Sequence, residues 1–114
     1  MTKVRRYTFS LGGEASNLKG RVGEFVAEKF LQRQGFKIVP INVVEFSGTW
    51  GSRDIQAEKN GKRYDIEVKY GRSKLTRIDR KELLKSKKHG LIPVVLRVSG
   101  DLNKDLWKIR WIEL

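Results

Sequence analysis

Cysteine is absent from this sequence, and histidine occurs once, at His89. Without cysteine the chain can form no disulfide and offers no thiolate to a metal ion. A single histidine also excludes a zinc site built on two or three imidazoles. Any metal bound here must therefore be held by oxygen ligands, which favours Mg²⁺ or Mn²⁺.

Long apolar runs are missing as well, and acidic residues are fewer than basic residues. No stretch approaches the roughly 20 residues that span a bilayer, and no apolar segment follows the basic start of the chain, so we expect neither a membrane span nor a secretory signal. Lys and Arg number 25 against 13 Asp and Glu, a formal net charge of +12. Nucleic acid, an anionic membrane surface and an acidic protein are the candidate partners of such a charge. We expect an intracellular protein that binds nucleic acid.

The length of 114 residues suits one domain with one modest core. Residues 1–17 have weak periodicity, and we interpret them as a basic arm, mobile or extended, ahead of a folded domain over 18–114. Hydrophobic periodicity and turn residues predict the elements of that domain. They are helices over 18–34 and 78–89 and strands over 36–46, 53–59, 62–70, 91–98 and 106–114. This order, αβββαββ, predicts an α/β domain with a central mixed sheet flanked by helices.

Asn60-Gly61 is a strong signal for a two-residue hairpin turn between the strands over 53–59 and 62–70. If these are the two central turn residues, the register places Asp54 directly opposite Glu67. Lys69 lies two residues beyond Glu67 and therefore points to the same face. The other face then carries an apolar set, so a slip of one residue would bury the carboxylates and is disfavoured.

Two opposed carboxylates repel each other, and a divalent cation removes that cost. A hard cation takes one or two carboxylates together with water and substrate phosphate. A lysine beside it can orient the attacking water and offset charge on the scissile phosphate. The pattern is therefore suited to phosphodiester hydrolysis. The alternative is a solvated hairpin face, on which Glu67 and Lys69 would be ordinary surface residues.

Asp54, a hairpin and then Glu67-Val68-Lys69 resemble the signature of the PD-(D/E)xK nucleases, with Arg53 in place of the proline. The resemblance extends to the archaeal Holliday-junction resolvases over about residues 19–114. Lys19-Gly20 followed by Glu24, and the closing Gly35-Phe36, are similar to the first helix of that family. Ile92-Pro93-Val94-Val95 and a final strand with tryptophan are similar as well.

The resemblance implies a restriction-endonuclease-like fold and an Mg²⁺-dependent endonuclease, with Mn²⁺ as a substitute. It implies that Glu24, Asp54, Glu67 and the Val68 carbonyl organise the metal and that Lys69 is the catalytic lysine. The resolvases also carry a serine in the loop before the aspartate; Ser47 and Ser52 are the candidates here, and their spacing differs from that of the family. Resolvases act as homodimers on four-way junctions, which implies a dimer and a branched DNA partner.

Basic residues gather around these positions, and we expect them to contact phosphates. They are Lys19, Arg21, Arg53, Arg72, Lys74 and Arg77. The cations of the helix over 78–89 are either a further contact or a solvated face. Trp107, Ile109, Trp111 and Ile112 are either core residues or the apolar area of a dimer interface.

We therefore expect a metal-dependent, structure-selective DNA endonuclease, of the Holliday-junction resolvase type, that acts in recombination and repair. One alternative is a PD-(D/E)xK enzyme that cuts duplex, flap or foreign DNA. A second alternative, from a different functional class, is a non-catalytic DNA-binding module with the same fold.

Overall fold

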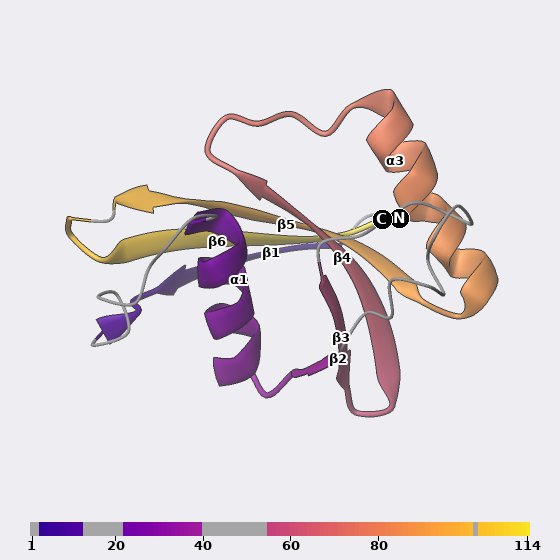
Figure 1. Cartoon of the computed structure of the whole chain (residues 1–114), viewed down its shortest axis with the longest axis horizontal. Helices are drawn as coiled ribbons and strands as arrows, with labels where there is room; N and C mark the ends of the chain where they lie inside the picture. The colour runs from indigo at the N-terminus through magenta and orange to yellow at the C-terminus, as the bar shows by residue number, and fades with distance from the viewer. Residues whose placement is uncertain (1–2, 13–21, 40–54, 102) are drawn as a thin grey trace.

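The computed structural model describes residues 3–12, 22–39, 55–101 and 103–114. These form one six-stranded sheet with two helices and a short 3₁₀ helix (Figure 1). In chain order the elements are β1 (Lys3–Phe9), α1 (Val22–Arg33), β2 (Lys37–Val39), β3 (Ile55–Lys59), β4 (Lys62–Tyr70), α3 (Arg77–Leu84), η2 (Lys85–His89), β5 (Ile92–Asp101) and β6 (Leu106–Glu113). Over the described residues, the predicted α/β class and the predicted order of elements from the first helix onward are confirmed.

The strands lie side by side in the order β1-β6-β5-β4-β3-β2. β4 and β5 run parallel, because the chain crosses over through α3 and η2 between them. The other described neighbours run antiparallel. The sheet is therefore mixed, as the sequence predicted, and β4 lies near its middle with Glu67 and Lys69 on it.

Alternation along the strands separates two faces of the sheet. The core face carries Ile66 and Val68 on β4 and packs against Val26 and Phe30 of α1. Trp107, Ile109 and Trp111 of β6 also belong to this core and are nearly or fully buried. Their apolar area is thus used inside the domain and is not available for a dimer interface. We call the opposite face, which carries Glu67 and Lys69, the site face.

The described parts of both helices fall within a residue or so of the predicted ranges. α1 is followed by Gly35 with φ +89°, and the N–H of Phe36 donates to the Leu31 carbonyl. The second predicted helix is divided into α3 and the 3₁₀ turn η2, which ends at Gly90 with φ +75°. α3 begins at a capping box, in which Thr76 and Asp79 each accept a hydrogen bond from the other's backbone N–H. Residues 18–21 of the predicted first helix and residues 40–46 of the predicted first strand lie outside the described residues.

The segment expected to be an N-terminal arm forms an edge strand over Lys3–Phe9. β1 pairs with β6 along its whole length, from Lys3 opposite Glu113 to Phe9 opposite Trp107. The Asp105 carboxylate holds the end of β1, because it accepts from the N–H groups of Leu11 at 2.8 Å and Gly12 at 2.7 Å. Weak periodicity hid this strand, because only its last residue, Phe9, is buried.

No helix in the described ranges is long and apolar enough to cross a membrane.

Candidate active site on the β3–β4 hairpin

The hairpin has the register that Asn60-Gly61 predicted. Lys59 lies opposite Lys62, and Ile55 lies opposite Ile66. Asn60 and Gly61 both have positive φ, at 53° and 79°, as the twist of a two-residue hairpin turn requires. The apolar side chains of both strands therefore face the core, and Glu67 and Lys69 face the other way.

Glu67 and Lys69 form an ion pair on the site face. The Lys69 Nζ lies 3.8 Å from Glu67 Oε1, and the two side chains are 15% and 17% exposed, Lys69 being the more covered. A freely solvated surface pair would show much larger exposure, so the prediction of an ordinary solvated hairpin face does not describe these two residues. The pair is sheltered from bulk water and still open enough to meet a ligand.

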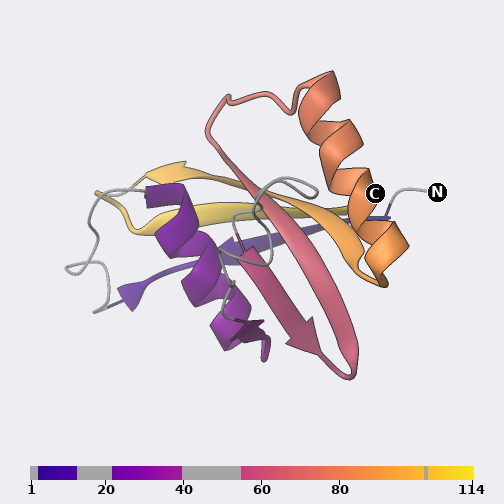
Figure 2. The same cartoon turned by 45° about the vertical axis from the view of Figure 1, so that its right-hand side comes forward.

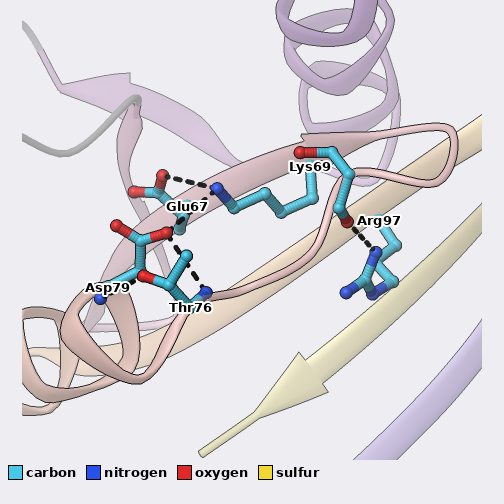
Figure 3. A network of polar contacts seen from close by, with 6 residues as sticks. Glu67, Lys69, Thr76, Asp79 and Arg97 are labelled. Carbon is cyan, nitrogen blue, oxygen red and sulfur yellow. Dashed lines mark hydrogen bonds and ion pairs between the residues drawn. The ribbon is translucent and has the colours of Figure 1, made fainter.

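A second carboxylate, on α3, also holds Lys69. Asp79 Oδ2 lies 3.3 Å from the Lys69 Nζ, so the ammonium group stands between Glu67 and Asp79 (Figure 3). Hydrogen bonds from the Thr76 side chain, then from its backbone N–H and from Lys69, hold the pKa of Asp79 below its ordinary value. Asp79 is therefore a carboxylate at neutral pH, and it ties the position of Lys69 to the start of α3.

The sequence reasoning missed Asp79. Its available signal was the spacing Thr76-x-x-Asp79 at the start of a helix, which resembles a capping box. That spacing predicts the local bond to Thr76. It does not predict that the same carboxylate reaches a lysine on β4, because this contact depends on how the loop after β4 returns α3 to the sheet.

Glu24 lies in the first turn of α1, on the helix that covers the core face. α1 approaches β4 closely here, since a Cβ added at Gly23 would lie 2.9 Å from the Cβ of Tyr70. Glycine at this position thus allows the start of α1 to lie directly beside the end of β4. That Glu24 joins the metal centre stays a prediction.

Several predicted site residues lie outside the described ranges. They are Lys19, Arg21, Ser47, Ser52, Arg53 and Asp54. Position 54 comes one residue before the first described pair of the hairpin, Ile55 with Ile66. That Asp54 faces Glu67 therefore stays a prediction, although the register from which it was drawn is confirmed.

The donor set on the site face fits a hard cation in its chemistry, because Glu67 offers carboxylate oxygens and no thiolate exists in the chain. Over the described residues, no group of three or more Asp, Glu, His or Cys side chains is arranged to hold a metal ion. Glu67 alone is too small a ligand set, so a metal centre here needs further oxygen ligands, for which Asp54 is the predicted source.

Three of the predicted phosphate contacts are described, and all are exposed. Arg72 and Lys74 lie in the loop after β4, and Arg77 begins α3. Arg77 and Arg80 line a groove of about 390 Å³ between α3 and the sheet, together with Arg97 of β5. The Arg97 guanidinium also donates to the Ser73 carbonyl at 2.7 Å, which fixes it beside this loop (Figure 3).

Comparison of the chain with protein-family models, with curated proteins and with solved structures gave no match.

Proposed function

We propose that this protein is a metal-dependent DNA endonuclease with a restriction-endonuclease-like fold, in which Glu67, Lys69 and Asp54 form the catalytic centre. The observation that carries the proposal is the placement of Glu67 and Lys69. They lie 3.8 Å apart, partly sheltered, on one face of a hairpin whose register continues toward Asp54. A DNA-binding module has no need of a sheltered carboxylate–lysine pair beside an exposed basic surface, so this geometry favours the enzyme.

Each residue of the pair has a task in phosphodiester hydrolysis. Bound Mg²⁺ would stabilise charge on the phosphate and lower the pKa of a bound water. Glu67 would hold the cation, with Asp54 and the Val68 carbonyl as the other proposed protein ligands and Glu24 supporting them. Lys69 would orient the attacking water or offset the charge that develops on the phosphate. Asp79, 3.3 Å from the Lys69 Nζ, holds the ammonium group in place and is thus a positioning residue.

The substrate class follows from the charge and from the family resemblance. A net charge of +12 favours DNA over a neutral or cationic substrate. The similarity of the Lys19–Glu24 and Glu67–Lys69 motifs to the archaeal Holliday-junction resolvases favours a four-way junction, cut by a homodimer on two strands. The exposed cations Arg72, Lys74 and Arg77 would contact phosphates beside the pair.

Cleavage of labelled DNA by the purified protein tests the proposal. The substrates are a four-way junction, a flap, a plain duplex and a single strand, each incubated with Mg²⁺, with Mn²⁺ and with EDTA. We expect paired symmetric nicks in the junction with either metal and none with EDTA. Lys69→Met is the inactive comparison, and Lys37→Met, which removes an equal charge from the exposed start of β2, should retain cleavage.

Metal-dependent cutting of the duplex or the flap would support the catalytic centre and show that the four-way junction is not the substrate. Tight binding without cutting under either metal would overturn the enzyme and favour the non-catalytic module. Cutting that persists in EDTA would contradict the metal dependence.

A further inference from the structure

Four cations stand in one line across the site face. Lys69 of β4 is paired in register with Arg97 of β5, Arg97 with Arg110 of β6, and Arg110 with Arg6 of β1. Residues paired across neighbouring strands point to the same face. The line therefore runs from the candidate catalytic lysine over four adjacent strands to the edge of the sheet.

A groove follows this line. It has a volume of about 860 Å³, and its lining includes Arg6, Arg97 and Arg110 together with Lys108. The described residues that line it include no Asp or Glu. Arg97 also lines the smaller groove beside α3, so the basic surface continues from the sheet to Arg77 and Arg80.

The helices leave this part of the site face uncovered. α1 packs on the core face. α3 stands over β4 and β5 at one end of the sheet, away from the turn that joins β5 to β6 (Figures 1 and 2). Arg6, Lys108 and Arg110 are accordingly exposed. A second copy of the same surface is a poor occupant, because like charges would face each other.

The line of cations also destabilises the protein when no ligand is bound. Like charges directly opposite one another on neighbouring strands destabilise a sheet, and here Arg110 faces Arg97 on one side and Arg6 on the other. A polyanion laid along the line would remove that repulsion. Neighbouring strands lie about 4.8 Å apart, so the four residues span about 14 Å. The phosphates of one DNA strand follow each other every 3.4 Å or so along the helix axis, so that length corresponds to about four steps from one phosphate to the next.

We propose that Arg6, Arg97, Lys108 and Arg110 form a track that holds the sugar-phosphate backbone of duplex DNA as it leaves the candidate active site at Lys69. This inference rests on the proposed function in one respect, namely that the track starts at the candidate active site. The track makes β1 part of the DNA interface. The track positions DNA without reading its sequence, because cations that contact phosphates carry no base information.

The test is the binding of a labelled DNA duplex in EDTA, measured by fluorescence anisotropy over a series of salt concentrations. The variant Arg6→Gln/Lys108→Gln/Arg110→Gln removes three cations of the track. The control Arg5→Gln/Lys37→Gln/Lys62→Gln removes three exposed cations elsewhere, and each protein has a net charge of 12 − 3 = +9. Arg5 is the closest match, since it precedes Arg6 on β1 and points to the opposite face.

If each track residue neutralises one phosphate, the slope of log affinity against log salt falls by about 2.7 in the track variant. Between 50 and 200 mM salt the parent should then lose about 40-fold more affinity than the track variant does. The control should keep a slope close to that of the parent. Urea unfolding should show the track variant to be at least as stable as the parent, since repulsion is relieved.

Equal binding and equal salt slopes in the parent and the track variant would overturn the inference, as would an equal loss in the control. A parent that cuts DNA in Mg²⁺ while both triple variants bind alike would overturn the track and leave the nuclease standing. A parent that binds through the track and cuts nothing would support the track and overturn the nuclease. A parent that does not bind DNA at all would overturn both.

Discussion

A metal ion at Glu67 should stabilise the folded protein, and Glu67→Gln should abolish that stabilisation. A ligand that binds only the native state raises the free energy of unfolding by an amount set by its concentration relative to Kd. At a cation concentration about ten times Kd, the gain is about 1.4 kcal/mol. For a domain of this size that corresponds to a rise in Tm of about 5 °C or somewhat more.

The hairpin supplies a matched control in Glu58→Gln. Glu58 lies on the same face as Glu67, opposite Arg63, and its carboxylate pairs with that arginine at 3.4 Å. Glu67 lies four residues beyond Arg63 on β4, a distance of about 13 Å along the strand. Magnesium takes its ligands at about 2.1 Å, so Glu58 cannot share a cation with Glu67.

The assay is thermal unfolding followed by circular dichroism, with Mg²⁺, with Mn²⁺ and with EDTA, at one ionic strength. We expect the metal-dependent rise in Tm for the parent and for Glu58→Gln, and no rise for Glu67→Gln. An equal rise in all three proteins would refute the reasoning, because the cation would then act away from Glu67. Loss of the rise in both variants would point to diffuse attraction by the hairpin rather than to a site.

Three further predictions concern the lysine, the anchor of β1 and the β5–β6 connection. Lys69→Met should lower the cleavage rate by about 10²–10⁴-fold. It should leave the metal-dependent rise in Tm in place, since the ammonium group that it removes competes with a cation for Glu67. Loss of the rise in Tm would mean that Lys69 acts by holding the site together. Asp105→Asn should destabilise the protein at neutral pH, because hydrogen bonds from the Leu11 N–H first, then from the Gly12 N–H and the Trp107 indole, hold the pKa of Asp105 below its ordinary value of 3.8. Because the pKa of Asp105 is lowered in the folded state, this stabilisation is complete above pH 3.8 and disappears as pH falls through the pKa of the folded protein. Urea unfolding should therefore show that the difference in free energy of unfolding between parent and variant becomes smaller in acid. A difference that is constant with pH would contradict the role of the carboxylate. Gly100→Ala should cost about 1–3 kcal/mol or more in urea unfolding, because its φ is +151° and the new Cβ would lie 2.3 Å from the Leu106 carbonyl oxygen, whereas Ser99→Ala, at the exposed neighbouring position, should be nearly neutral.

Local patterns in the sequence were enough to determine the geometry of the hairpin. Asn60-Gly61 permits the positive φ angles of a two-residue turn, and that turn sets which residues of β3 and β4 face each other. A period of two then puts Glu67 and Lys69 on one face, away from the apolar side chains. These interactions are between near neighbours in the chain, so the candidate pair could be predicted without knowing the rest of the fold.

The sequence did not predict the surroundings of that pair, because they depend on contacts between distant segments. Asp79 reaches Lys69 only because the crossover brings the start of α3 back over β4. Arg6 comes into line with Lys69 only through the strand order, which inserts β6 and β5 between β1 and β4. No local pattern carries that order, since the packing of apolar side chains on the core face selects which strands become neighbours and in which register. The sequence by itself thus determined the candidate catalytic pair, and the tertiary structure decided what holds the lysine and where the basic surface runs.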